Sequence, residues 1–175
     1  LYSKNETLVL YFDYTSKPNE LEVQGSAAIT DAKGLYFINP KGEDKTKPTQ
    51  IWTQGETEGN SVWMITMDKP NQKTTQEIYM TVPQKYVTLS NGLKISEKKN
   101  ADGTRTDYWK QDLPHSTYLF FMGVGDYAII KDKPYKGKEV SYYVKPDQAP
   151  YAMGVFGNTP EMITFFSEKL GVEYP

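Results

Sequence analysis

The sequence contains no cysteine and a single histidine, His115, among its 175 residues. Without cysteine the chain has no disulfide, no thiolate nucleophile and no cysteine-ligated zinc. A two-histidine zinc motif needs two imidazoles, commonly one helical turn apart, so one histidine is too few. A Ser-His-acid triad would have to use His115, which we expect to be a surface residue of a turn, and no serine stands in a G-x-S-x-G elbow. We therefore expect no complete active site and no activity from this chain alone.

Long apolar runs and blocks of one charge are also missing. No apolar stretch approaches the roughly 20 residues of a transmembrane helix. Basic and acidic residues are interspersed and the formal net charge is −2, so we expect no nucleic-acid partner. Leu1 is not methionine, so we expect the natural start upstream, where a targeting segment could precede it. The compartment stays open between the cytoplasm and the periplasm or another extracytoplasmic space.

The chain is rich in aromatic residues, with 14 Tyr, 7 Phe and 3 Trp. Together with many Thr and Val, these residues favour strands over a helical bundle. The clearest hairpin has arms at 93–99 and 105–111 around the turn Asn100-Ala101-Asp102-Gly103, whose residues tolerate positive φ. Short β-type runs predict further strands at 8–14, 34–38, 50–54, 61–66, 74–82, 86–90, 117–122, 126–131 and 139–144, with Gly123 to Gly125 as a bend.

The character of the sequence changes near the carboxyl end. An apolar stretch covers 149–156, and a helix is predicted from Thr159, with Pro160 in its first turn and Gly171 as its stop. Strands first and helices last predict a mainly β fold, an antiparallel β-sandwich or saddle with a short helical carboxy-terminal tail. We place the β domain at residues 1–146, with early strands expected to be missing, and the helical segment at residues 147–175.

One acidic segment is unusual for a strand-and-loop region. Glu56 and Glu58 stand between two glycines and near two tryptophans, Trp52 and Trp63. A carboxylate in a partly dry cleft is a natural receiver for an ammonium group. The alternative is a solvated acidic turn, and composition alone favours it because glutamate is usually exposed.

Five segments occur in the order and spacing of a known family. They are Thr53-Gln54-Gly55-Glu56, Asp68-Lys69-Pro70, Ser90-Asn91-Gly92, the run from Leu119 to Gly123, and the helical region 159–175. This series resembles the amino-terminal domain of the aminopeptidase N and leukotriene hydrolase family of zinc metallopeptidases (gluzincins). The resemblance extends over about residues 6 to 175.

The resemblance implies a saddle-shaped β domain that packs on a thermolysin-like catalytic domain, absent here, to which residues 147–175 would lead. It implies that the parent protein hydrolyses peptides with zinc bound outside this chain, by a His-Glu-x-x-His helix. It also implies that Glu56 binds the free α-amino group of the peptide substrate, and that Gln54 helps to shape the first specificity pocket. The sequence departs from the family where Asn60 and Ser61 replace the usual arginine, and where residues 64–67 replace Phe-Pro-Cys.

Two other readings stay open. A stand-alone β-sandwich binding module, for carbohydrate or protein, would use exposed Trp and Tyr side chains. A purely structural domain of a larger assembly would leave Glu56 without a role. The residues encoded after Pro175 would discriminate, because a Gly-Ala-Met-Glu-Asn stretch followed by His-Glu-x-x-His is expected only for the peptidase.

Overall fold

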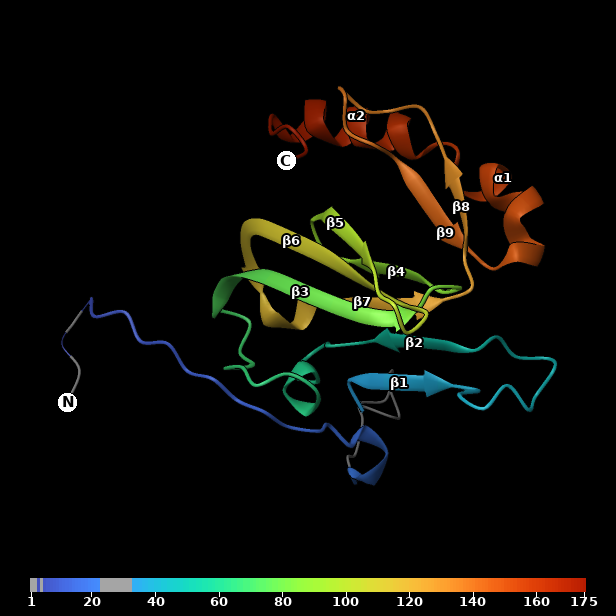
Figure 1. The fold of residues 1–175 in the computed structure, drawn as a ribbon. Helices are drawn as coiled ribbons and strands as arrows, with labels where there is room; N and C mark the ends of the chain where they lie inside the picture. Colours follow the sequence, from blue (N-terminus) through green and yellow to red (C-terminus); the bar gives the residue numbers. More distant parts are fainter. Residues whose placement is uncertain (1–2, 4, 23–32) are drawn as a thin grey trace.

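The computed structural model describes residues 3, 5–22 and 33–175 (Figure 1). Its strands are β1 (Leu35–Ile38), β2 (Gln50–Thr53), β3 (Lys73–Pro83), β4 (Val87–Ser90), β5 (Leu93–Lys99), β6 (Thr104–Ser116), β7 (Met122–Gly125), β8 (Ala128–Lys131) and β9 (Ser141–Val144). Its helices are α1 (Ala152–Phe156) and α2 (Thr159–Leu170), with 3-10 turns η1 (Pro18–Glu20), η2 (Asn60–Val62), η3 (Thr117–Leu119) and η4 (Pro146–Tyr151). The predicted fold class, mainly antiparallel β with a helical carboxyl end, is confirmed. No helix in the described part of the chain is long and apolar enough to cross a membrane.

The strands form three antiparallel sheets, with the orders β1-β2-β7-β4, β3-β6-β5 and β8-β9. The two larger sheets lie one over the other (Figure 1). Their facing side chains make one core, in which Met80, Val82, Trp109 and Val124 are buried. Strand β3 buries every second residue around Met80 while Tyr79 is exposed, which is the predicted half-exposed pattern.

The β5–β6 hairpin forms at the predicted turn. Gly103 has φ +83°, a conformation that costs glycine nothing. Asp102 supports the turn, because its Oδ1 accepts hydrogen bonds from the Thr104 amide at 2.9 Å and from the Thr104 hydroxyl at 2.6 Å. These bonds fix the register in which β5 and β6 pair.

A second, smaller core lies in residues 128–175, which we call the carboxy-terminal unit. It is formed by Tyr135, Val140 and Tyr142 of the β8–β9 hairpin region, with Ile163 of α2 packed against them. Helix α2 ends at Gly171, whose φ of +65° gives the expected left-handed stop. The hairpin therefore packs with the helices, and this unit lies above the two larger sheets in Figure 1. The domain boundary at residue 146 stays a prediction.

Several predicted strands are wrong. Residues 8–14 are extended but pair with no strand among the described residues, and Val9 is 86% exposed. An apolar run becomes a strand only when a neighbouring strand takes up its backbone hydrogen bonds. Residues 61–66 contain the 3-10 turn η2, and residues 117–122 begin with the 3-10 turn η3. The predicted bend at residues 123–125 belongs instead to β7.

Candidate functional site

Glu56 lies on a loop that begins directly after β2. The position of this loop is set by the pairing of β2 with β1 on one side and β7 on the other. Thr53, the last residue of β2, is buried, and its hydroxyl accepts a hydrogen bond from the Met122 amide at 3.0 Å. The backbone amide of Gln54 then donates to the Gly34 carbonyl at 2.9 Å. The sheet therefore fixes the start of the loop.

The far end of the loop is held by the side chain of Asn60, which is 0% exposed. Its Nδ2 donates to the carbonyls of Thr117 and Phe120, at 2.7 and 3.0 Å. Its Oδ1 accepts from Trp63 Nε1 at 2.8 Å. Asn60 thus joins the loop to the β6–β7 connection, a segment about 60 residues further along the chain.

Asp68 of the Asp-Lys-Pro segment makes a second connection to the same place. Its Oδ2 accepts a hydrogen bond from the Ser61 amide at 2.8 Å, and its Oδ1 accepts from the Thr117 hydroxyl at 2.9 Å. Both Asp68 and Thr117 are buried. A buried carboxylate stays favourable because donors surround it. The sequence singled out Asp68 only as part of a motif, and the structure shows its bonding role.

Gly55 allows the loop to lie directly against η3. A Cβ atom at this position would collide with the Asn60 side-chain amide and with the Tyr118 carbonyl. The backbone of the loop therefore approaches η3 more closely than any larger residue permits. Glu56 is the next residue, so its backbone leaves from a fixed point.

The two glutamates of the loop differ in their partners. Both are exposed, but Glu58 accepts two hydrogen bonds from Lys69 Nζ, at 2.7 and 2.8 Å. Glu56 has no ion pair or hydrogen bond within the described residues, so its carboxylate is available to a ligand. Gln54, the other predicted site residue, is half-buried beside it at the end of β2. Both residues therefore leave the same end of the sheet.

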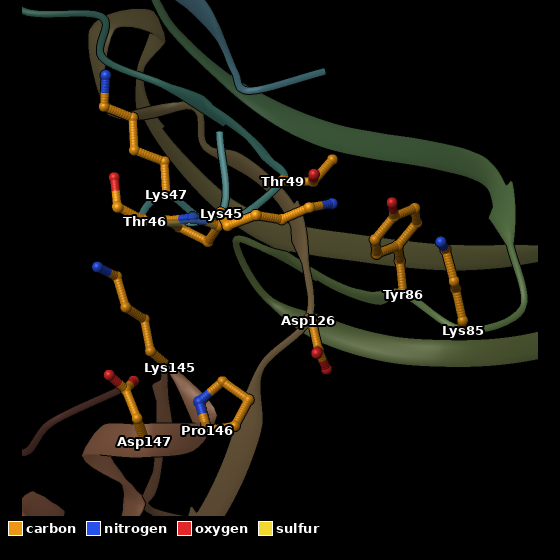
Figure 2. A pocket seen from close by; sticks show the side chains of 11 residues that line it. Lys45, Thr46, Lys47, Thr49, Lys85, Tyr86, Asp126, Lys145, Pro146 and Asp147 are labelled. Atoms are coloured by element: carbon orange, nitrogen blue, oxygen red, sulfur yellow. The ribbon is translucent and has the colours of Figure 1, made fainter. Parts of the chain in front are cut away.

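Two cavities lined by described residues lie away from the loop of Glu56. A cleft of about 480 Å³ is lined by exposed lysines and two aspartates from the loops around residues 45–49, 85–86, 126 and 145–147 (Figure 2). A groove of about 980 Å³ separates β5 from β9 and α2. Neither Glu56 nor Gln54 lines either of them. The described residues thus present Glu56 on an open surface rather than in a closed pocket.

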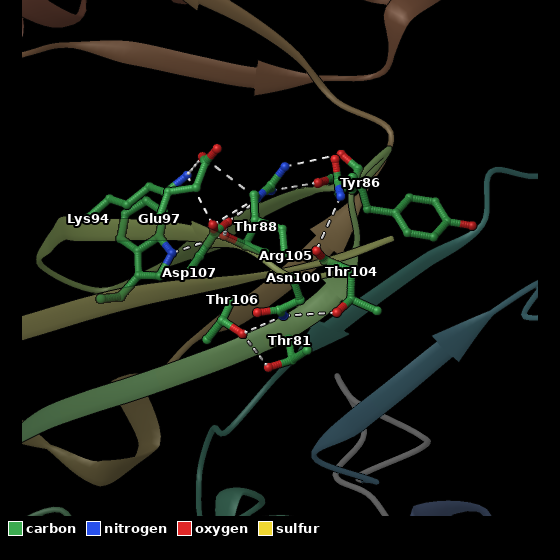
Figure 3. Close-up of polar contacts among 12 residues, drawn as sticks. Thr81, Tyr86, Thr88, Lys94, Glu97, Asn100, Thr104, Arg105, Thr106 and Asp107 are labelled. Atoms are coloured by element: carbon green, nitrogen blue, oxygen red, sulfur yellow. Dashed lines mark hydrogen bonds and ion pairs between the residues drawn. The ribbon is translucent and has the colours of Figure 1, made fainter. Parts of the chain in front are cut away.

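Among the described residues, one fully buried charge lies outside the loop of Glu56. Asp107 of β6 is 0% exposed and accepts from Arg105 Nε at 2.8 Å and from the Thr88 hydroxyl at 2.6 Å (Figure 3). Lys94 Nζ of β5 lies 3.3 Å from it. Burial raises the pKa of Asp107, but these bonds and positive charges outweigh burial and hold the pKa below its ordinary value. The cluster links β4, β5 and β6. It was not predicted from the sequence.

The residues of this chain do not fit the zinc ion that the resemblance implies for the parent. His115 lies in β6 rather than in the predicted turn, and its ring packs on Phe120 with centroids 4.6 Å apart. Its Nδ1 bonds the Leu113 carbonyl at 3.0 Å. No group of three or more potential metal-binding side chains occurs among the residues that the structure describes.

Comparisons with known proteins agree on one family. A family model described as the peptidase M1 N-terminal domain matches residues 1–119. Glutamyl aminopeptidase of Rattus norvegicus is 31% identical over 143 residues, which are 81% of this chain and 15% of that protein. Aminopeptidase N of Escherichia coli is 29% identical over 158 residues, which are 85% of this chain and 17% of that protein.

The fold is shared with a solved structure, that of Legionella pneumophila aminopeptidase A in complex with aspartic acid. The TM-score is 0.64 at 23% identity, over 81% of this chain and 16% of that one. The chain spans between 11% and 18% of the length of the curated relatives that it matches.

Proposed function

The chain belongs to the peptidase M1 N-terminal domain family, and on this premise we propose that it helps a larger aminopeptidase to bind the free amino terminus of a peptide. The observation that carries the proposal is Glu56, a carboxylate without a partner among the described residues, on a loop held by buried hydrogen bonds. An ammonium group forms a charge-assisted hydrogen bond with such a carboxylate. Gln54, at the end of the same strand, would line the pocket for the first side chain.

An ammonium anchor at Glu56 performs two tasks. An acylated amine is neutral and would leave the carboxylate unpaired in a dry site, so the contact discriminates a free amino terminus from an internal peptide bond. The anchor also sets how far the peptide enters, so that only its first peptide bond reaches the reacting groups. Both tasks need a carboxylate at a fixed position, which the loop supplies.

The catalytic residues and the zinc of the parent would come from a further domain of the same protein. The chain offers that domain a surface, because α2 exposes Met162, Phe165, Phe166 and Leu170. Exposed apolar patches of this kind mark sites of association. The second wall of the amine site would come from the same domain, since Glu56 lies on an open surface here.

The alternative of a stand-alone module that binds carbohydrate through aromatic side chains has less support. Trp52 stacks on Tyr36 with ring centroids 4.5 Å apart, Trp63 bonds Asn60, and Trp109 is buried. Two tryptophans are thus half-buried with a partner within the fold and the third is buried, which leaves little tryptophan surface for a sugar.

The direct test replaces Glu56 in the full-length protein. Glu56→Gln is nearly isosteric and should keep the fold, but it loses the charge on the acceptor. We expect a higher KM and a loss of kcat/KM on the order of 10- to 150-fold with aminoacyl-anilide substrates, because hydrogen bonds to charged groups contribute that much. Discrimination against amino-acetylated substrates should shrink as well.

Glu58→Gln is the matched control for this substitution. It stands two residues away, and its carboxylate already pairs with Lys69 at 2.7 Å, so we expect a much smaller effect on kcat/KM. Equal and small effects of the two substitutions would contradict the role of Glu56, and the loop would then be a solvated acidic turn.

A further inference from the structure

The side chain of Asn60 makes three hydrogen bonds, two of which join the loop that carries Glu56 to the β6–β7 connection. Both hydrogens of its amide are used, one on the Thr117 carbonyl at 2.7 Å and one on the Phe120 carbonyl at 3.0 Å. The amide oxygen accepts from the Trp63 indole at 2.8 Å. An asparagine bonded at both ends has one orientation only, since a flipped amide would place oxygen against two carbonyls.

The loop has few other connections that could replace this one. Within the loop, the Gly59 amide bonds the Gly55 carbonyl at 2.8 Å, which shapes the loop but does not attach it to η3. Asp68 attaches the residue after Asn60, through the Ser61 amide at 2.8 Å. Among the described residues, Asn60 is therefore the only side chain of the loop segment 54–60 that hydrogen-bonds η3 or Phe120, the residue that follows it.

The backbone of Gly55 lies against the Asn60 amide itself, with no space for a Cβ atom between them. Movement of the Asn60 side chain toward Gly55 would therefore displace the Gly55 backbone, and Glu56 is the next residue. A binding constellation works only when its groups are held within about 0.5 Å of their places. The buried Asn60 amide thus packs on the residue that precedes the exposed Glu56.

From these contacts we propose that Asn60 is a positioning residue for the amine anchor and acts on substrate binding through Glu56. The inference rests on the proposed function of Glu56. Here a neutral amide, bonded to carbonyls of the β6–β7 connection, holds the loop.

The test is a double-mutant cycle in the full-length protein, with Asn60→Ala, Glu56→Gln and the combination. With Glu56 present, Asn60→Ala should raise KM for free-amine substrates and lower kcat/KM by roughly 10-fold or more, because small misplacements of a binding group are costly. In the Glu56→Gln background the same substitution should lower kcat/KM by less than about 2-fold, because the interaction that it disturbs is already lost.

Asn91→Ala is the matched control. Asn91 also bridges to the β6–β7 connection, with Nδ2 donating to the Leu119 carbonyl at 3.0 Å and Oδ1 accepting from the Phe121 amide at 2.6 Å. It does so from the β4–β5 turn, and within the described residues no hydrogen bond joins it to the loop segment 54–60. We expect Asn91→Ala to lower stability without raising KM.

Trp63→Phe is the milder variant should Asn60→Ala fold poorly. It removes only the donor to the Asn60 oxygen. We expect a smaller rise of KM than for Asn60→Ala, again present with Glu56 and absent in the Glu56→Gln background. Effects of Asn60→Ala or Trp63→Phe that are equal in both backgrounds, or that lower kcat and leave KM unchanged, would overturn the positioning role while the anchor stands. An inert Glu56→Gln would instead overturn the proposed function, and the positioning role with it.

Discussion

The two larger sheets, β1-β2-β7-β4 and β3-β6-β5, with their connections form what we call the two-sheet body, and it differs from the carboxy-terminal unit in how its groups are buried. In the two-sheet body, apolar residues of both sheets share one core, and buried polar residues such as Asp107 and Asn60 find their partners within the body. The carboxy-terminal unit has a core of three buried hydrophobic residues, against four in the core of the body. Its helix α2 leaves Phe166 57% and Leu170 72% exposed. The first region is closed around its buried polar groups, although β5 exposes Leu93 and Ile95, and the second is open along one face of α2.

The exposed apolar face of α2 indicates which region depends on a partner. A two-stranded sheet such as β8–β9 is marginal by itself and needs a helix or another surface to pack against. Helix α2 supplies one face, and its other face borders an apolar groove of about 330 Å³ with Val172 and Tyr174. We infer that the fold of the two-sheet body is set by its own residues, whereas the carboxy-terminal unit gains stability when that groove is covered.

The largest expected effect comes from breaking the charge cluster of the two-sheet body. Arg105→Ala removes the guanidinium that bonds Asp107 at 2.8 and 2.9 Å. Removal of one partner from a buried ion pair costs about 3–5 kcal/mol, and we expect the lower end because Lys94 remains 3.3 Å from the carboxylate. Urea unfolding of the chain, followed by circular dichroism, measures the loss.

Lys131→Ala is the matched control in the carboxy-terminal unit. Its Nζ pairs with Glu139 at 2.8 Å on an open surface, and such pairs contribute little because water screens them. If Lys131→Ala destabilised the chain as much as Arg105→Ala does, the contrast between a closed body and an open unit would be wrong.

A smaller effect is expected from pH. Asp107 has a lower pKa in the folded protein than the ordinary 3.8. It therefore stabilises the fold above pH 3.8, and this contribution is lost as the pH falls through the folded pKa. The free energy of unfolding should fall more steeply toward acid pH in the wild type than in Asp107→Asn. Identical pH dependence in urea titrations of the two proteins would show that Asp107 does not contribute.

The smallest effect on stability is expected at the exposed face of α2, which distinguishes the carboxy-terminal unit from the two-sheet body. Phe166→Glu should leave the free energy of unfolding almost unchanged, because the side chain is more than half exposed. It should reduce self-association in light scattering and the fluorescence of a dye that binds apolar surface. Val155→Ser, on α1, is the control and should change neither. A strictly monomeric wild-type chain without dye binding would contradict the open face.

The hairpin and the inner strands were predictable because their signals are local. Asn100 to Gly103 specifies a turn by its conformational preferences, and alternation within β3 specifies which face is buried. Residues 8–14 have an equally strong local pattern, but they find no partner strand among the described residues. Their conformation depends on long-range pairing, which no single segment encodes.

The candidate site was predictable only in part. The motif identified Gln54 and Glu56 through a resemblance, and their roles stay predictions. The importance of Asn60 was not predicted, because its partners Thr117 and Phe120 lie far along the chain. The sequence shows only that Asn60 and Ser61 are polar residues between Gly59 and the apolar pair Val62-Trp63. The burial of Asn60 in the structure reveals its structural role.

Ligand binding without turnover directly tests the proposed role of Glu56 as the anchor of the free amine. The dissociation constants of an amino-acid amide and of its des-amino analogue would be measured for the full-length protein and for Glu56→Gln. We expect the wild type to prefer the amine by roughly 10- to 150-fold and the variant to lose most of this preference. An equal preference for the amine in both proteins would contradict that role.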